Sequence, residues 1–140
     1  MFERYAEGSR RVIFYARDAA FERGSATIEP YHLLLGVERE DKQAAELFIA
    51  AHPAMETLRE PDPERGPAVD LTKIKFSQRS KRALAWAAES SDKEGSRSIG
   101  PLHLLAGLLR GIENPEANRS ARLSLRGRLV CIVDRLRGVR

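Results

Sequence analysis

Three histidines and one cysteine are the side chains of this chain that could hold a transition metal or form a nucleophile and base pair. His32 and His103 each follow a proline by two residues, whereas His52 and Cys131 stand apart from them in the sequence. Metal sites need several ligands at close spacing, and no local Cys/His motif is present. We therefore expect His32 and His103 to be structural residues, and we expect neither a metal nor another cofactor.

Motifs for catalysis are also missing from the 140 residues. The sequence has no Gly-x-Ser-x-Gly turn, no His-Glu-x-x-His pair and no Gly-rich dinucleotide loop. It has no Gly-Lys pair, so it lacks the loop that cradles nucleotide phosphates. A dyad of Cys131 with a histidine stays open, but burial in the apolar run 129–133 should raise the pKa of this thiol and lower its reactivity. We do not expect an enzyme.

The two equivalent histidines belong to a repeat with a period of 71 residues. Residues 5–39 align without a gap with residues 76–110, and the most similar stretches read IEPYHLLLG and IGPLHLLAG. Twelve aligned positions are identical, namely Ser9, Arg11, Ala16, Gly24, Ser25, Ile28, Pro30, His32, Leu33, Leu34, Gly36 and Arg39 with their counterparts. A register held over this length indicates a tandem duplication, which explains the matching histidines as copies of one residue.

Each copy is expected to begin with two helices, because small and apolar residues recur at spacings of three and four. The first helix should stop at Gly24 or Gly95, since glycine adopts the left-handed conformation at little cost. The second should begin at Pro30 or Pro101, because the first helical residue needs no N–H partner.

The whole chain is expected to be all-α, with two four-helix repeats related by a pseudo-two-fold axis. A third helix is predicted over residues 43–51 and a fourth after Pro53, and their copies in the second repeat should be the least faithful. Three of the seven prolines fall between residues 61 and 75, which predicts a linker. The expected division of the single 1–140 unit is repeat 1 at about 1–60, linker at about 61–75 and repeat 2 at about 76–140.

The net charge of +4 is concentrated at the end of the chain. Residues 119–140 carry seven arginines and one acid, so the first 118 residues have a net charge of −2. This basic tail supports an alternative function, binding of nucleic acid or another polyanion, but it lacks the interleaved aromatic residues that stack on bases. The charged N-terminus is unlike a signal peptide, and no segment reaches the roughly 18 apolar residues of a membrane span. We expect a cytoplasmic protein with no membrane contact, and nucleic acid is the less favoured partner.

The residues that carry the repeat also resemble a known family. The stretch MFERYAEGSRRVIFYARDAAFERGS, followed by IEPYHLLLGVERED, is similar to the N-terminal Clp repeat domain of ClpC/ClpA-type AAA+ unfoldases, which contains two such motifs. The resemblance covers nearly the whole chain and is strongest over about 1–60 and 76–110. It implies a non-catalytic module that binds adaptors and substrate polypeptides for a Clp ATPase ring. The chain would be either an excised domain or a free-standing adaptor, and the initiator Met with no onward linker favours the second.

The sequence departs from this family at two positions. In similar proteins the residue before the motif histidine is a glutamate implicated in recognising phosphorylated arginine, and here those positions are Tyr31 and Leu102. Neither side chain offers a carboxylate, so we do not expect phospho-arginine recognition there. Glu29 is interpreted as an acid at a helix N-terminus. Tyr31 and Leu102 mark either a changed ligand or an inactive site.

The resemblance implies a second surface, where the first helices of the two halves meet. Its expected protein-binding or peptide-binding residues are Phe2, Arg10, Ile13, Phe76 and Lys81. An apolar centre with a cationic rim suits a polypeptide partner. The alternative is that Phe2 and Phe76 only hold their helices onto the core.

Phe14 is unusual because it lies opposite the apolar stripe of the first helix, where a solvated residue is expected. Its counterpart in the second copy is Ala85. Phe14 either packs against the other half or is an exposed anchor for a partner, and packing is the preferred interpretation.

Overall fold

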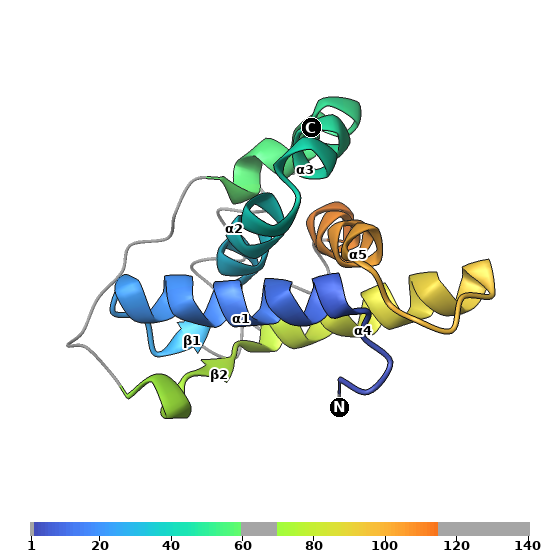
Figure 1. Cartoon of the computed structure of the whole chain (residues 1–140). Helices are drawn as coiled ribbons and strands as arrows, with labels where there is room; N and C mark the ends of the chain where they lie inside the picture. The colour runs from blue at the N-terminus through green and yellow to red at the C-terminus, as the bar shows by residue number, and fades with distance from the viewer. Residues whose placement is uncertain (1, 60–69, 115–140) are drawn as a thin grey trace.

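The computed structural model describes residues 2–59 and 70–114, which form helices joined by short turns (Figure 1). The elements, with η for a 3-10 helix, are α1 (Glu7–Glu22), β1 (Thr27–Ile28), α2 (Pro30–Glu40), α3 (Lys42–Ala51), η1 (Pro53–Leu58), η2 (Leu71–Lys73), β2 (Lys75–Phe76), α4 (Gln78–Glu94) and α5 (Pro101–Glu113). The all-α prediction is confirmed, since each strand has only two residues.

The predicted ends of the helices are confirmed in both copies. Gly95 directly follows α4, and Gly24 follows α1 after the capping residue Arg23; their φ angles are 77° and 71°. Pro30 and Pro101 are the first residues of α2 and α5. Glycine therefore ends the first helix of each pair, and proline begins the second.

His32 and His103 act at the starts of α2 and α5. The Nδ1 atom of His32 accepts the backbone N–H of Glu29 at 2.9 Å, and Nδ1 of His103 accepts that of Gly100 at 2.9 Å. Each imidazole thus turns back to satisfy a backbone donor that the helix leaves without a partner. The structural interpretation of both histidines is confirmed.

The third and fourth helices of the first copy are shorter than α1 and α2. The helix predicted over residues 43–51 is α3, and the one predicted after Pro53 is the 3-10 helix η1, which buries Met55 and Leu58. Their predicted copies lie in residues 115–140, outside the described part of the chain. The segment expected to be a linker contains η2 and the first residue of β2 in its described portion.

The two copies exchange strand partners. Strand β1 pairs in parallel with β2, so that Ile28 lies opposite Phe76, and an isolated parallel bridge pairs Tyr5 with Ile99. The repeat register relates Ile28 to Ile99 and Tyr5 to Phe76. The two pairings are therefore equivalent, because each joins the first residue type of one copy to the second residue type of the other, as a pseudo-two-fold axis requires.

Two buried serines repeat this exchange with their side chains. The hydroxyl of Ser9 donates to the carbonyl of Ile99 at 2.7 Å, and the hydroxyl of Ser80 donates to the carbonyl of Ile28 at 2.6 Å. Both serines have no exposed surface. The hydroxyl groups therefore hold each first helix against the other copy.

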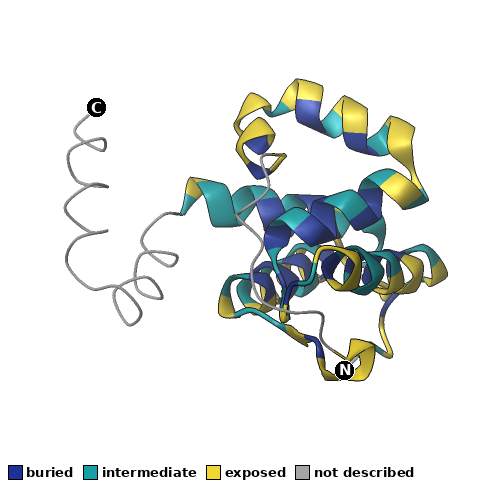
Figure 2. Cartoon of the chain, turned by 90° about the vertical axis from the view of Figure 1, so that its left-hand side faces the viewer, coloured by how far each residue is buried: buried dark blue, intermediate teal, exposed yellow. Residues whose placement is uncertain are grey.

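The core lies between the helix pairs. α1 packs on α2, α4 packs on α5, and α2 contacts α5, so the second helices of the two copies meet at the centre. Buried residues line the inward sides of the helices, and exposed residues line the outward sides (Figure 2). The largest fully buried apolar side chains are Ile28, Leu33, Leu34, Met55, Leu105, Val12 and Val37. Burial of this apolar surface stabilises the fold and fixes the positions of the outward-facing residues.

Candidate functional site

The two phenylalanines predicted to form the binding surface are in contact. The rings of Phe2 and Phe76 pack edge to face with their centroids 5.9 Å apart, and Phe2 also packs against Tyr5 at 4.8 Å. Both phenylalanines are partly buried against the core and partly accessible. Phe2 and Phe76 therefore do pack on the core, as the alternative interpretation expected, and part of each ring stays at the surface.

A shallow cavity of about 410 Å³ adjoins Phe2 and is lined by Phe2, Glu3, Arg10 and Ile13. Ile13 is almost completely buried and forms an apolar floor. The guanidinium of Arg10 donates to the carbonyl of Glu3 at 3.4 Å, which places a cation at the rim. Three of the five predicted residues thus share one cavity.

Phe76 and Lys81 complete the predicted surface from the second copy. Phe76 joins this surface by its contact with the ring of Phe2, whereas Lys81 is an exposed residue of α4. Lys81 does not line the cavity. In the repeat register Lys81 corresponds to Arg10, so the pseudo-symmetry gives each first helix an exposed cation at the same turn. We call Phe2, Arg10, Ile13, Phe76 and Lys81 the groove.

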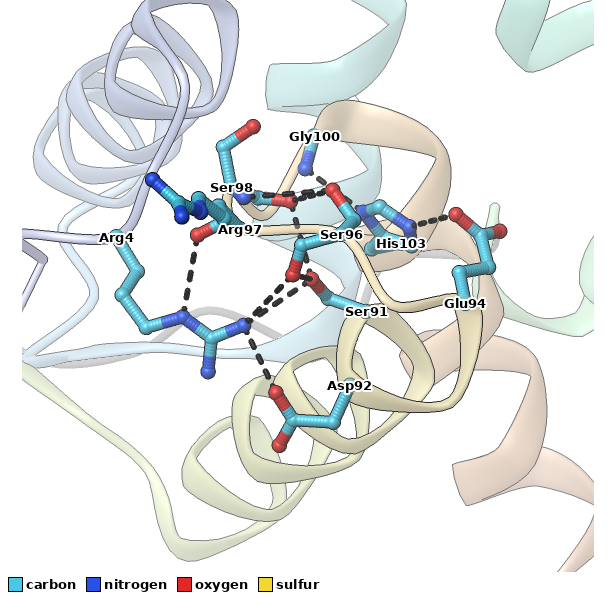
Figure 3. Close-up of polar contacts among 9 residues, drawn as sticks. All are labelled: Arg4, Ser91, Asp92, Glu94, Ser96, Arg97, Ser98, Gly100 and His103. Atoms are coloured by element: carbon cyan, nitrogen blue, oxygen red, sulfur yellow. Dashed lines mark hydrogen bonds and ion pairs between the residues drawn. The ribbon is translucent and has the colours of Figure 1, made fainter.

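Arg4 holds the segment that carries Phe2, and the sequence analysis did not identify it. Its Nη2 lies 2.9 Å from Oδ1 of Asp92 and donates to the hydroxyl of Ser91 at 3.2 Å (Figure 3). Its Nε donates to the carbonyl of Arg97 at 3.3 Å, so one side chain joins the N-terminal segment to the end of α4 and the loop after it. The repeat register pairs Arg4 with Lys75, and this repeated cation is the feature of the sequence that could have pointed to Arg4.

Tyr5, next to Arg4, is buried at the bridge to Ile99. Burial raises the pKa of its phenol to about 12, because the ionised form would lose its hydration. Tyr5 is therefore a neutral packing residue beneath Phe2.

The two positions that depart from the family pattern lie in different surroundings. Tyr31 is half-buried, and the guanidinium of Arg23 lies over its ring at 5.1 Å, whereas Leu102 is 59% exposed. Glu29 is the residue that precedes α2, as predicted, and its carboxylate accepts the hydroxyl of Thr27 at 2.6 Å.

Phe14 is 64% exposed, so the preferred interpretation that it packs against the other half is wrong. Its ring contacts only the edge of the neighbouring Tyr15 among the aromatic contacts of the described residues, with centroids 5.9 Å apart. The helical periodicity had placed Phe14 on the solvent side of α1, and the structure follows the periodicity.

A larger cavity of about 660 Å³ opens on another side of α1, and the sequence analysis did not foresee it. It is lined by Tyr15, Ala19, Glu22, Tyr31, Leu34, Leu35, Glu38, Arg39, Lys42, Glu46 and Arg59. We call this cavity the three-helix cleft, and its charged lining residues are three glutamates, Glu22, Glu38 and Glu46, and three cations, Arg39, Lys42 and Arg59.

Residues 2–59 and 70–114 offer no further site chemistry of the kinds considered above, a metal centre or a membrane span. No three His, Cys, Asp or Glu residues there come together as a metal-ion group. None of the helices in the same ranges is long and apolar enough to span a membrane. Cys131 and the basic tail of residues 119–140 lie outside these ranges.

Comparison with known proteins identifies a family. Residues 4–118 match the family model described as the Clp repeat (R) N-terminal domain. The chain is 30% identical over 126 residues to the chloroplastic chaperone protein ClpD2 of Oryza sativa subsp. japonica, covering 84% of this chain and 13% of the relative. It is 29% identical over 114 residues to the negative regulator of genetic competence ClpC/MecB of Bacillus subtilis (strain 168), covering 79% of this chain and 14% of the relative. The chain thus spans only a small part of the length of these relatives.

Solved structures agree on the fold. The N-terminal domain of the chaperone ClpD from Arabidopsis thaliana superposes with a TM-score of 0.59 at 23% identity, covering 98% of this chain and 97% of that one. The Hsp104 N-terminal domain from Candida albicans gives a TM-score of 0.62 at 16% identity, covering 83% of each chain. At these identities the likeness concerns the fold alone.

Proposed function

Because the chain belongs to the Clp repeat N-terminal domain family, we propose that it binds adaptor or substrate polypeptides on behalf of a Clp ATPase ring and catalyses no reaction itself. The names of several relatives, such as the ATP-binding subunit ClpA homolog of Porphyra purpurea, refer to ATP-dependent Clp proteases. The Walker-type loop that such a subunit needs is missing from these 140 residues. The module would therefore supply binding, and the ring would supply ATP hydrolysis.

The observation that carries this proposal is the groove. Phe2 and Phe76 offer partly exposed aromatic surface in mutual contact, and Ile13 gives the adjoining cavity an apolar floor. Arg10 lines the cavity and provides a cation there, and Lys81, its counterpart in the repeat register, is an exposed cation of α4. Aromatic and arginine side chains are the residue types that contribute most to protein interfaces. An extended polypeptide with apolar side chains fits such a surface.

The direct test is binding of a permanently unfolded protein, such as fluorescein-labelled, reduced and carboxymethylated α-lactalbumin, followed by fluorescence anisotropy. Phe2→Ala and Arg10→Ala should each weaken binding by about thirtyfold, which corresponds to the roughly 2 kcal/mol of an interface hot spot. Leu47→Ala is the matched control, because Leu47 is 64% exposed on α3 and lies outside the groove. It should bind as the parent does.

Equal losses in Leu47→Ala and Phe2→Ala would reject the groove as the binding surface. No binding by the folded parent chain would reject the polypeptide-binding role itself. Circular dichroism and melting curves of each variant separate a lost contact from a lost fold, which matters because Phe2 also packs on Tyr5.

A further inference from the structure

The ion pair that joins α1 to α2 is repeated between α4 and α5. Arg39 on α2 lies 3.3 Å from Asp18 on α1, and Arg110 on α5 lies 2.6 Å from Glu89 on α4. The repeat register relates these two pairs residue by residue. Each guanidinium also lies over an aromatic ring of the first helix, 4.6 and 5.3 Å from its centre. The two copies therefore join their paired helices in the same way at this level.

A second polar link of the first copy is missing from the second copy. Nε and Nη2 of Arg11 on α1 donate to the two carboxylate oxygens of Glu40 on α2 at 2.8 and 2.7 Å. In the repeat register Arg11 corresponds to Arg82 on α4, but Glu40 corresponds to Gly111 on α5. Gln78 stands where the first copy has the other acid that contacts Arg11. The second copy therefore keeps the cation and lacks both of its carboxylates.

Two arginines of α4 are left without an acceptor. Nε of Arg79 and Nε of Arg82 are buried and have no hydrogen-bond partner, and neither side chain forms an ion pair among the described residues. Arg79 and Arg82 are three positions apart, so they lie on the same face of α4. Gly8, the counterpart of Arg79, has no side chain, so this second cation belongs to one copy alone. We call Arg79 and Arg82 the arginine pair.

The surroundings of the arginine pair are neutral and apolar. Arg79 lines a small cavity beside Gly111 and is the only charged residue in its lining, which also includes Leu108 and Ile112. The cavity measures about 10 Å³, so a ligand would bind at its mouth rather than inside. A Cβ atom built on Gly111 would meet only the ring of Trp86 among the described residues, at 3.5 Å, so a side chain fits there.

Neighbouring acids do not neutralise the arginine pair. Glu89 on α4 already contacts Arg110. Glu113 follows Gly111 by two residues and therefore lies on the opposite side of α5. The carboxylate of Glu29 accepts the donors at the start of α2. Two half-buried cations therefore lie together with no acid in contact among the described residues.

We propose that the arginine pair binds a carboxylate of a partner polypeptide, on an aspartate or glutamate side chain beside an apolar residue. The carboxylate takes against Arg82 the place that the Glu40 carboxylate takes against Arg11. The planar guanidinium group suits this two-point contact, and the first copy contains an example of it. The apolar neighbour covers the partly exposed side chains of Ile112 and Trp86.

This site deepens the function proposed above, since it rests on that function for the kind of partner and adds the chemistry that the partner must carry. It shares no residue with the groove. The two surfaces can therefore be tested separately on the same full-length chain.

A first experiment needs no ligand. Gly111→Glu returns the missing carboxylate to the second copy, and Gly111→Gln has nearly the same shape without the charge. At low salt Gly111→Glu should melt about 2–4 °C above Gly111→Gln, as expected for one partly exposed ion pair. The difference should disappear when Arg79→Gln and Arg82→Gln are added to both. Equal melting temperatures with the arginine pair intact would show that the pair does not reach a carboxylate there, and would overturn the proposal.

A second experiment measures binding by fluorescence anisotropy. The probe is a short fluorescein-labelled peptide in which leucine and glutamate alternate, and the matched peptide has glutamine in place of every glutamate. The glutamate peptide should bind the parent chain at low salt about tenfold more tightly than the glutamine peptide. The difference should shrink as salt rises, because the contact is between partly exposed charges.

Variants locate this interaction. Arg79→Gln combined with Arg82→Gln should remove most of the preference for glutamate. Gly111→Glu should also weaken the glutamate peptide by about tenfold, because its own carboxylate competes, whereas Gly111→Gln should bind as the parent does. Lys42→Gln combined with Lys73→Gln is the charge-matched control, since both lysines are exposed and belong to α3 and η2. Melting curves verify that each variant is folded.

Equal binding of the glutamate and glutamine peptides would overturn the proposal. So would equal losses in the arginine-pair variant and the lysine control, or a preference removed by Phe2→Ala in place of Arg79→Gln and Arg82→Gln. A chain that binds unfolded protein at the groove without preferring glutamate would sink this site and leave the proposed function standing. A chain that binds the glutamate peptide at the arginine pair but no unfolded protein would sink the groove and leave this site standing.

Discussion

Gly36 and Gly107 are equivalent residues at which the second helix of each repeat comes closest to the backbone of the first helix. A Cβ atom built on Gly36 would lie 2.5 Å from the carbonyl oxygen of Val12, and one on Gly107 would lie 2.2 Å from that of Ala83. The repeat register relates Gly36 to Gly107 and Val12 to Ala83. Helices α1 and α2, and likewise α4 and α5, therefore touch through their backbones at a point where no side chain fits.

Alanine at either glycine should destabilise the fold. The obstacle is a backbone carbonyl rather than a flexible side chain, so the helices must move apart, at a cost of about 1–3 kcal/mol. Gly107→Ala should cost more than Gly36→Ala, because its contact is closer. Urea unfolding measures both.

Gly111→Ala is the control for this pair. Among the described residues its added Cβ would meet only Trp86 Cζ3, at 3.5 Å, an ordinary contact, and alanine favours the helix by about 0.5–1 kcal/mol over glycine. A Gly111→Ala protein as unstable as Gly107→Ala would show that helix geometry, rather than the close approach, sets the cost.

Removing the exchanged serine hydroxyls should weaken both halves. Ser9→Ala and Ser80→Ala should each cost about 1 kcal/mol, because each breaks one buried hydrogen bond while its carbonyl partner keeps a backbone donor. Those remaining donors are the N–H groups of Ala6 and Ser77. Ser90→Ala, at a partly exposed site on α4, should leave the free energy of unfolding nearly unchanged. Similar stabilities for all three variants would contradict the role of the exchange.

The Arg11–Glu40 pair should make stability depend on acid pH. Nε and Nη2 of Arg11 donate to the two carboxylate oxygens of Glu40 at 2.8 and 2.7 Å, and they hold the pKa of Glu40 below its ordinary 4.5. The folded state then binds fewer protons than the unfolded state, so this contribution is present above about pH 4.5 and is lost as pH falls through the lowered pKa. Glu40→Gln should flatten the acid side of the profile of unfolding free energy against pH. A slope unchanged from the parent, with Glu113→Gln as control, would rule this out.

Tyr5 should make the free energy of unfolding depend on pH in alkaline solution. Its pKa is raised to about 12 by burial, so the folded state retains a proton that the unfolded state releases near pH 10. The stability that this group contributes is complete below about pH 10 and is lost as pH rises through about 12. Tyr5→Phe should remove the latest step from an absorbance titration of tyrosinate formation. Survival of that step would assign it to another phenol.

Arg4 should order the segment that carries Phe2. Arg4→Gln removes the contact with Asp92 and the charge-assisted bond to Ser91, so amide exchange over residues 2–6 should speed up while the helices keep their protection. Polypeptide binding at the groove should weaken in parallel. The control is Arg97→Gln, which keeps the backbone carbonyl that Arg4 uses. Unchanged exchange in Arg4→Gln would mean that Phe2 and Tyr5 hold the segment without it.

Much of the fold follows from local rules that act within a few residues. Gly24, Gly95, Pro30 and Pro101 set the ends of helices through their own backbone preferences, and the repeat register doubled the information on each one. The exposure of Phe14 also follows from periodicity, and the packing interpretation failed because it set that periodicity aside.

The long-range contacts could not be read in the same way. Strands of two residues have no alternating pattern, so the pairing of Ile28 with Phe76 leaves no signal of its own in the sequence. The three-helix cleft is lined by residues of α1, α2 and α3 together with Arg59, and their proximity depends on how the helices pack. Arg4 reaches Asp92 across 88 positions of the chain, which local spacing does not encode.

The hydrogen bonds exchanged by Ser9 and Ser80 give the surface between the halves the self-complementary character of an isologous dimer. Two separate half-length chains would meet through the same bonds only as their concentration allowed. Joining them in one chain replaces that equilibrium by an intramolecular closure, with an effective concentration in the millimolar range for a short connection. The pair therefore withstands dilution, and each half is free to change its outer surface alone, as it has where Phe14 and Phe21 stand in register with Ala85 and Asp92.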